Sequence, residues 1–330
     1  MQSIRQDEEI KYITDSQALR LGLQNVEEEL SYIVDQSDIT IRDMIKTLFK
    51  SGKRLRPKLV FLSGMCFDDL NKHMIYSAVS AELIHTASLV HDDIIDVSDF
   101  RRNYPTINHL CGDHIAVLTG DFLFAHAFDI LAFNNLNKSM SYLVNAIREM
   151  CVGEIMQAER KFNPDITENE YIDYIGRKTA SLFSACCKAG AENAGANDDN
   201  ICMMGIFGYD IGCAFQIIDD ILDIIGSENE LGKPVAHDIL EGDINLPLIY
   251  LIEDKKYKDK YGELLLSKQI DSNQQENIME DIKRSDALVR SRHKAEEFAE
   301  HAVNSLSTIP YSNYRNILID MSAEIIDRRY

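Results

Sequence analysis

Apolar residues recur every three or four positions along most of this chain, a spacing that gathers them on one face of an α-helix. Two stretches interrupt the pattern: residues 98–112 are predicted to be a loop, and residues 227–243 a loop or short helices. Pro57 suits the first turn of a helix, whereas Gly195 and Gly226 suit helix ends. The pattern predicts helices over residues 15–35, 38–50, 56–67, 71–97, 113–133, 137–160, 168–175, 178–195, 199–226, 244–254, 275–305 and 312–328.

The composition agrees with this helical pattern. Hydrophobic residues make up 45% of the 330 residues, which is enough for a sizeable core, and the six Pro and sixteen Gly are scattered. No low-complexity linker or short-period repeat divides the chain. We therefore expect an all-α fold with a single domain over residues 1–330.

Charge and cysteine content narrow the class of protein further. The 34 Lys and Arg against 54 Asp and Glu give a formal net charge of −20, and so acidic a surface repels nucleic acid. The seven cysteines include no CxxC pair, which predicts reduced thiols rather than a disulfide scaffold or a zinc site. The first residues do not resemble a signal peptide, and no uninterrupted apolar stretch approaches the roughly 20 residues that span a bilayer. We expect a cytoplasmic protein with no transmembrane segment.

Two DDxxD motifs differ from the other Asp-Asp pairs of the chain, because each lies in a strongly apolar helical run. They read DDIID at 92–96 and DDILD at 219–223. On a helix, positions four apart share one face, so Asp92 lies above Asp96 and Asp219 above Asp223. Like charges at this spacing repel, and partial burial increases the cost.

Divalent cations would remove this repulsion. Carboxylates, substrate phosphates and water are the usual ligands of Mg²⁺, so two such motifs suit several Mg²⁺ ions around one diphosphate. Two solvated acidic faces are the alternative interpretation. Calcium binding of the EF-hand kind is disfavoured, because the Asp-x-Asp-x-Asp-Gly loop is absent.

Basic groups accompany the motifs in this acidic chain. Helix N-termini attract anions, so cations at a helix start suit a diphosphate, although each alone is also a common solvated charge. His85 lies seven residues before Asp92, two turns earlier on the same face, where it suits a phosphate contact. The candidate cations are Lys53 and Arg56 at one helix start, Arg101 and Arg102 after the first motif, Lys178 beside Thr179 at another helix start, and Lys233 after the second motif.

These segments together resemble the trans-type polyprenyl diphosphate synthases, over nearly the whole chain. The resemblance implies a single-domain helical bundle of the isoprenoid synthase type around a deep central cavity, usually as a homodimer. The motifs that carry it are GKRLRP at 52–57, the two aspartate-rich regions at 84–96 and 215–223, Arg101-Arg102 with Pro105-Thr106, Gly120-Asp121, Gly153-Glu154 with Gln157, and Lys178-Thr179-Ala180.

The resemblance also implies a role for each matched residue. The catalytic set would be Asp92, Asp96, Lys178, Thr179, Gln216 and Asp219, with Thr179 and Gln216 at the reacting end, where they help to stabilise positive charge. The Mg²⁺ ligands would be Asp92, Asp96 and Asp219, supported by Asp223. The diphosphate of isopentenyl diphosphate would be held by Lys53, Arg56, His85 and Arg102, and the allylic diphosphate by Arg101, Lys178 and Lys233.

The implied reaction is a head-to-tail condensation. Mg²⁺ would make the allylic diphosphate a leaving group, and the double bond of isopentenyl diphosphate would attack the resulting cation before a proton is lost. Three positions depart from the family pattern: Asn103 replaces a glycine, Ala236 precedes His237-Asp238 where GxD is common, and Asp243 replaces a basic residue. The last change would weaken one diphosphate contact without abolishing catalysis.

Product length depends on the helix that carries the first motif. Ala87 and Ser88 lie one turn before Asp92 and are small, whereas a bulky aromatic residue there stops the growing tail early in the family. Small residues therefore predict a long, octaprenyl-like product from farnesyl diphosphate or a similar primer, as in a ubiquinone side chain. Phe128 is a candidate for the floor of the cavity.

Other activities remain open at this stage. A synthase of farnesyl or geranylgeranyl diphosphate would use the same motifs. A terpene cyclase would also use DDxxD and Mg²⁺, but its second metal motif differs and it needs no site for isopentenyl diphosphate. The pair His91-Asp92 would also suit a metal phosphohydrolase, but such an enzyme would need further histidine ligands. A regulatory subunit of a two-component synthase would be expected to lose aspartates of the motifs.

Overall fold

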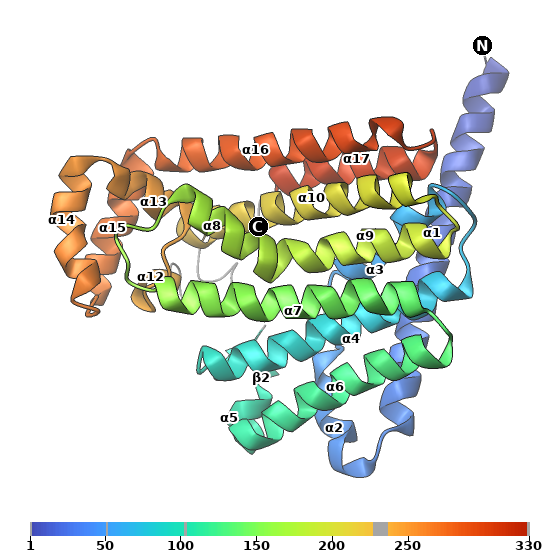
Figure 1. Ribbon diagram of the computed structural model, residues 1–330, viewed down its shortest axis with the longest axis horizontal. Helices are drawn as coiled ribbons and strands as arrows, with labels where there is room; N and C mark the ends of the chain where they lie inside the picture. The colour runs from blue at the N-terminus through green and yellow to red at the C-terminus, as the bar shows by residue number, and fades with distance from the viewer. Residues whose placement is uncertain (1, 51, 102–103, 227–236, 329–330) are drawn as a thin grey trace. The chain divides into compact units, whose positions relative to one another are not determined.

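The computed structural model describes residues 2–50, 52–101, 104–226 and 237–328, with the backbone alone for residues 2–15 and 237, and it is almost entirely helical (Figure 1). The all-α fold is therefore confirmed. The elements are α1 (Gln2–Gln36), α2 (Ile39–Leu48), α3 (Leu55–Met65), α4 (Lys72–Ile95), β1 (Phe100–Arg101), β2 (Tyr104–Pro105), α5 (Ile107–Cys111), α6 (Asp113–Phe133), α7 (Asn137–Arg160), α8 (Glu168–Ile175), the π-helical turn η1 (Gly176–Ala180), α9 (Ser181–Asn193), α10 (Asp198–Ile225), α12 (His237–Leu240), α13 (Leu246–Glu253), α14 (Lys255–Leu266), α15 (Ser272–Arg284), α16 (Ala287–Ser305), the 3₁₀ turn η2 (Leu306–Thr308) and α17 (Asn313–Ile326).

Most predicted helices are present, and the differences have local causes. The predicted helix 275–305 is two helices, because Ser285 is extended and its hydroxyl accepts a hydrogen bond from the Ala287 amide, which starts α16. The helix α14 was not predicted, although Asp254 caps it by accepting from the Lys256 amide. The predicted loop 98–112 contains the short antiparallel pair β1–β2 and the helix α5.

The residues of the chain group into two compact units. The first combines Met1–Ile147, Leu182–Gly205 and Leu306–Ile319, and the second combines Arg148–Ser181, Ile206–Ser305 and Asp320–Tyr330. Each unit is thus assembled from three separate segments. A single domain over residues 1–330 stays a prediction.

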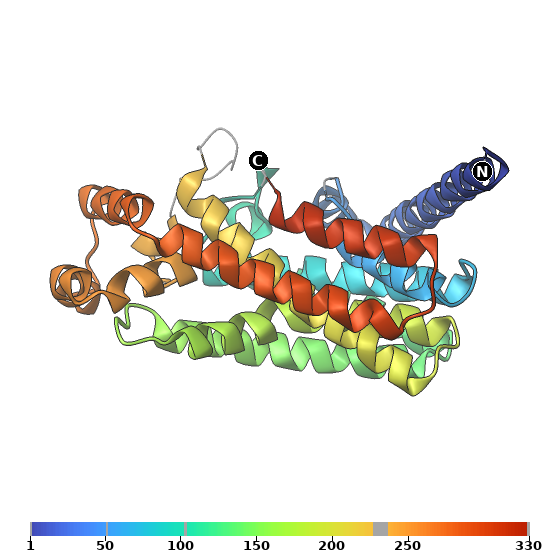
Figure 2. The same ribbon diagram turned by 90° about the horizontal axis from the view of Figure 1, so that it is seen from above.

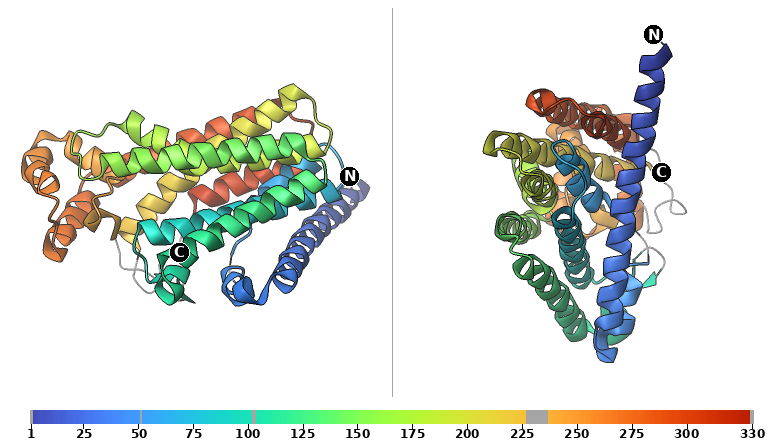
Figure 3. Two further views of the ribbon diagram at one scale, coloured as in Figure 1. Left: turned by 60° about the horizontal axis from the view of Figure 1, so that its bottom comes forward. Right: turned by 90° about the vertical axis from the view of Figure 1, so that its right-hand side faces the viewer.

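The helix α4 lies at the centre of the first unit, where it packs along α6 and also contacts α3 and α1 (Figure 3). Asn71 caps α4 by accepting from the Met74 amide, and the buried side chains of the helix include Leu83, Ile84 and Val90. The helices α3 and α9 approach closely at Gly190, because a Cβ atom there would lie 2.1 Å from the carbonyl oxygen of Val60.

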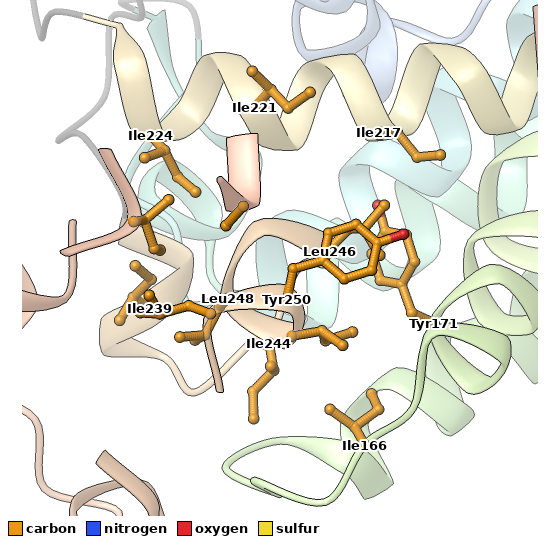
Figure 4. Close-up of a cluster of buried hydrophobic side chains, with 14 of the residues drawn as sticks. Ile166, Tyr171, Ile217, Ile221, Ile224, Ile239, Ile244, Leu246, Leu248 and Tyr250 are labelled. Carbon is orange, nitrogen blue, oxygen red and sulfur yellow. The ribbon is translucent and has the colours of Figure 1, made fainter. Parts of the chain in front are cut away.

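The core of the second unit is a cluster of buried apolar side chains from α8, α10 and α13 (Figure 4). Tyr171, Ile217 and Leu246 in this cluster are fully buried. The helices α14 and α15 lie side by side (Figure 2), since Lys260 and Tyr261 both bind the carboxylate of Asp281, at 2.7 and 2.6 Å. The buried part of α10 holds the second motif in place.

Two helices, α6 and α10, are long and apolar enough by length and composition to cross a membrane. The core helix of a soluble protein passes the same test, and 67% of the apolar window of α10 is buried inside the protein. The corresponding window of α6 is 33% buried. Its exposed apolar side chains are Val117, Leu118 and Phe133. The expectation of no transmembrane segment stays a prediction.

Candidate active site

The first DDxxD motif forms the C-terminal end of α4. Asp92 lies in the last turn and Asp96 is the C-cap, with its amide donating to the Asp92 carbonyl at 2.8 Å. His85, Ser88, Asp92 and Asp96 are all half-buried and recur at helical spacing, so they form one stripe along α4. A helix C-terminus carries partial negative charge, and no basic residue occupies the last turn of α4. A cation would therefore offset unfavourable charge at this helix end.

The middle aspartate of this motif faces another way. Asp93 is 5% exposed and accepts a hydrogen bond from Arg101 Nε at 2.7 Å. Burial raises the pKa of the Asp93 carboxyl, and the charge of Arg101 opposes that rise. Asp93 thus holds the predicted diphosphate ligand Arg101 beside the motif. Arg102 lies outside the described residues.

The second motif likewise forms the end of a helix, α10, whose last turn contains no basic residue. Asp219 Oδ1 accepts a hydrogen bond from Arg328 Nη1 at 2.7 Å, and the guanidinium of Arg328 also lies 4.8 Å from the centre of the Phe215 ring. Asp223, one turn after Asp219, is 4% exposed. Sequence reasoning missed Arg328, because nothing in its local sequence connects it with the motif.

The middle aspartate of the second motif is also buried. Asp220 accepts from Tyr171 Oη at 2.7 Å and from Gln216 Nε2 at 2.8 Å. Gln216 Oε1 in turn accepts from Thr179 Oγ1 at 2.8 Å, so two residues predicted to act together are in contact. Burial raises the pKa of Asp220 to about 8, although both of its hydrogen bonds lower it.

Lys178 and Thr179 lie in the π-helical turn η1, which joins α8 to α9. The prediction of a helix start at Lys178 is therefore wrong, because the chain continues as helix on both sides. Gly153 on α7 permits close contact here, since a Cβ atom would lie 2.5 Å from the Lys178 amide nitrogen. The ammonium of Lys178 contacts Glu154 at 2.6 Å and Gln157 at 2.7 Å. These contacts explain why the motif residues Gly153, Glu154 and Gln157 accompany Lys178. Single π turns are also frequent at functional sites.

The GKRLRP segment starts α3, as predicted, and its three cations differ in exposure. Lys53 is exposed, Arg56 is half-buried with its guanidinium 5.0 Å from the Phe183 ring centre, and Arg54 is 9% exposed. Arg54 binds Glu27 at 2.6 Å and Glu82 at 2.9 Å. Lys53 and Arg56 stay predicted diphosphate ligands, while Arg54 has a structural role that sequence reasoning missed.

The donor atoms of the two motifs suit a hard cation. Carboxylate oxygens are the protein ligands that Mg²⁺ prefers, and it usually keeps phosphate or water oxygens as well. Among the residues that the structure describes, no three Asp, Glu, His or Cys side chains are grouped as a metal site. Substrate phosphate and water oxygens would complete the coordination of such an ion. Lys233, the cation predicted after the second motif, lies outside the described residues.

Asp243, which replaces the family's basic residue, lies 3.5 Å from Lys161 Nζ. Lys161 also lies 3.7 Å from Glu241, so one lysine serves two carboxylates. The two loops touch directly: the Phe162 amide donates to the Gly242 carbonyl at 2.7 Å. Gly242 has a φ of +84°, which favours glycine. A cation is thus present near position 243, supplied from another loop.

We expect Asp243→Asn to gain stability over the wild type as pH rises. Burial raises the pKa of the Asp243 carboxyl from its usual 3.8 to about 6, against the charge of Lys161. The folded state therefore binds this proton more tightly than the unfolded state, and the stabilisation is lost as pH rises through about 6. Thermal denaturation of both proteins at pH values near 4 and near 7 measures the difference. A difference in Tm that does not change with pH would contradict this assignment.

Comparison with known proteins places this geometry in a family. The family described as Polyprenyl synthetase matches residues 39–282. Heptaprenyl diphosphate synthase component 2 of Bacillus subtilis (strain 168) is 36% identical over 91% of this chain and 90% of that protein. The crystal structure of heptaprenyl diphosphate synthase from Staphylococcus aureus is 30% identical, with a TM-score of 0.89 over 94% of this chain and 99% of that one.

A second solved structure adds a ligand complex to the comparison. Polyprenyl synthase from Caulobacter crescentus CB15, complexed with calcium and isoprenyl diphosphate, is 31% identical, with a TM-score of 0.88 over 96% of this chain and 98% of that one. Both the sequence and the structural matches extend over nearly the full chain. The chain therefore belongs to the polyprenyl synthetase family and is a polyprenyl diphosphate synthase, a prenyltransferase.

Proposed function

We propose that this enzyme condenses isopentenyl diphosphate with farnesyl diphosphate or a similar primer to make a long, octaprenyl-like, all-trans polyprenyl diphosphate. The observation that carries the proposal is the pair of acidic helix ends. Each DDxxD motif concentrates carboxylates where a helix terminus is already negative, without a basic residue in the last turn. Such charge suits divalent cations and a bound diphosphate.

We assign the metal to Asp92, Asp96 and Asp219, with Asp223 in support, and take the ion to be Mg²⁺. A bound Mg²⁺ would neutralise the allylic diphosphate and so assist its departure. The relative from Caulobacter crescentus, solved with calcium, supports the use of a divalent cation. The neighbouring cations would hold and orient the diphosphates, with Lys53, Arg56 and His85 on isopentenyl diphosphate and Arg101 and Lys178 on the allylic substrate.

Chain length is proposed from the surroundings of the first motif. Ser88 is half-buried on the same stripe of α4 as Asp92. Ala87 is fully buried on the face towards α6, where Ser80 donates to the Ala127 carbonyl at 3.2 Å and His91 approaches the Val117 carbonyl at 3.2 Å. Ser88 is therefore the small residue past which a growing tail would run. The relatives named above that make heptaprenyl diphosphate support a long product.

We expect Ser88→Phe to shorten the product to fifteen or twenty carbons, because the aromatic ring would fill the path one turn from Asp92. Ser88→Ala is the matched control, since it removes the hydroxyl that bonds the His85 carbonyl at 2.9 Å but adds no bulk. Chain length is read by chromatography of the dephosphorylated products. A full-length product from the phenylalanine variant would show that the tail follows another face of α4.

The experiment that tests the function is product analysis. Purified protein is incubated with Mg²⁺, labelled isopentenyl diphosphate and farnesyl diphosphate, and the products are separated by length. A single long product supports the proposal, whereas fifteen or twenty carbons would make the enzyme a short-chain synthase. Cyclic hydrocarbon from farnesyl diphosphate alone would point to a cyclase.

The assembly is proposed to be a homodimer. The exposed apolar side chains Val117, Leu118 and Phe133 on α6 support self-association, because burying them in a second copy would remove apolar surface from water. The relative from Bacillus subtilis is named as one component of its synthase, so a different second chain is the alternative. Light scattering and product assays on the purified chain alone distinguish the two: an inactive monomer would favour a second component.

A further inference from the structure

Four side chains of the second unit form a continuous series of hydrogen bonds. Tyr171 Oη on α8 lies 2.7 Å from Asp220 Oδ2, and Gln216 Nε2 lies 2.8 Å from Asp220 Oδ1, both on α10. Gln216 Oε1 lies 2.8 Å from Thr179 Oγ1 in η1. Tyr171 and Asp220 are buried, whereas Gln216 and Thr179 are half-buried. Tyr171 belongs to the apolar cluster of the core (Figure 4). The series therefore runs from the core to the π turn that carries Lys178.

The series has a fixed direction. Gln216 has an acceptor and a donor end, and only the donor end can bind an oxygen that accepts. Asp220 Oδ1 accepts whether the carboxyl is ionised or carries a proton on Oδ2, where Tyr171 can share that proton. The amide of Gln216 therefore keeps its carbonyl towards Thr179. Thr179 must then donate its single hydroxyl proton to Gln216, which leaves oxygen lone pairs for its other side.

We propose that Tyr171 and Asp220 are positioning residues that fix the hydroxyl of Thr179 with its oxygen, and not its proton, directed at the reacting end of the allylic substrate. This inference rests on the proposed function, in which positive charge develops on that substrate. An oxygen lone pair held in place before the reaction stabilises such a charge, whereas a hydroxyl proton turned the other way would oppose it. The orientation of the Gln216 amide therefore decides whether the oxygen or the proton of the Thr179 hydroxyl faces the substrate.

Asp220 thus has a different role from its neighbour Asp219. Both oxygens of Asp220 are engaged by protein donors, and the side chain is 8% exposed. The first motif repeats the arrangement, since the middle aspartate Asp93 is buried and binds Arg101 at 2.7 Å. In each DDxxD motif the second aspartate therefore points into the protein and orients a neighbouring functional group.

The conservative variant Asp220→Asn separates positioning from metal binding. Its amide offers an oxygen to Gln216 and an NH₂ group to Tyr171 Oη, so the direction of the series is kept although the charge is lost. We expect kcat within about fivefold of the wild type, with unchanged KM values for both diphosphates. A metal ligand would not survive this change, because losing its charge weakens Mg²⁺ binding.

The apolar pair Tyr171→Phe/Asp220→Leu breaks the series without leaving a buried hydroxyl unpaired. It frees the Gln216 amide to turn, and we expect kcat to fall about a hundredfold, as when one oriented dipole is removed from an active site, with KM unchanged. Tyr174→Phe is the matched control, since Tyr174 is buried one turn later in the same cluster and its hydroxyl reaches the Ile244 carbonyl at 3.4 Å rather than Asp220.

A double-mutant cycle with Thr179→Val decides whether the effect passes through Thr179. Without that hydroxyl, the apolar pair should lower kcat by less than about threefold further. If the fold-reductions in kcat caused by the apolar pair and by Thr179→Val simply multiplied, the proposal would be overturned. An Asp220→Asn variant as slow as the apolar pair would overturn it as well. A wild-type protein that made no polyprenyl diphosphate would contradict the proposed function itself. The positioning role is tested only by comparing variants of an active wild type, so the two outcomes are distinguishable.

Discussion

Asp92→Ala is expected to lower kcat for prenyl transfer by about a thousandfold or more while the protein stays folded. Asp92 shares the half-buried stripe of α4 with Asp96 and lies in the last turn of a helix that has no basic residue of its own in that turn. Removing it would take away a metal ligand and the charge stabilisation that goes with it, which is worth several kcal/mol in the transition state. The fold should gain slightly, because one like-charge repulsion at a helix C-terminus disappears.

The measurement is steady-state product formation against Mg²⁺ concentration, with circular dichroism as the check on folding. Asp199→Ala is the matched control, because Asp199 also belongs to an Asp-Asp pair but is exposed in the first turn of α10. Its removal should leave kcat unchanged and cost only the small favourable interaction of an acid with a helix N-terminus. Near wild-type turnover in Asp92→Ala would remove the first motif from the catalytic site.

The placement of both motifs on helices was predictable from the sequence. The apolar residues around 92–96 and 219–223 recur at helical spacing over several turns, and long periodic segments are the most reliable to interpret. The same reasoning placed GKRLRP at the start of α3, because Pro57 is suited to a first turn. Local sequence is sufficient in these cases, since the pattern of one helix decides the result.

The directions of individual side chains were not predictable in this way. The spacing of a DDxxD motif shows that its first and third aspartates share a face, but the partners of the second come from elsewhere in the chain. Asp220 meets Tyr171 from α8, and Asp243 meets Lys161 from another loop. The π turn at Lys178 was missed for the same reason, because tertiary contacts at Gly153 accompany it and helical periodicity does not reveal it.

Arg54→Met is expected to lower the free energy of unfolding by about 3–5 kcal/mol, because it breaks a buried ion pair. The guanidinium is 9% exposed and contacts Glu27, Glu82 and the Phe49 carbonyl, the last at 2.7 Å. Glu82 is itself 5% exposed, and among the described residues its second oxygen has no hydrogen-bond partner. Without Arg54 the Glu82 carboxylate would lose this ion pair and would remain buried.

The backbone of Arg54 adds to this dependence. The residue is the N-cap of α3 with a φ of +49° in the left-handed region, a conformation that costs a non-glycine residue about 1–2 kcal/mol. The ion pairs of Arg54 therefore offset the cost of this backbone conformation, and a methionine at position 54 would not offset it. Urea denaturation of the wild type and Arg54→Met measures the loss, and Lys58→Met, on a half-buried lysine four residues later in α3, is the control with little expected effect.

A second substitution separates the charge effect from lost packing. In Arg54→Met/Glu82→Gln the buried carboxylate is neutral, so most of the lost stability should return, because the penalty comes from one uncompensated charge rather than from the missing contacts. Equal instability of the single and double variants would instead assign the loss to packing and to the left-handed backbone. Since Glu82 lies on α4 ten residues before Asp92, recovery would also show that Arg54 neutralises a buried charge on the helix that carries the first motif.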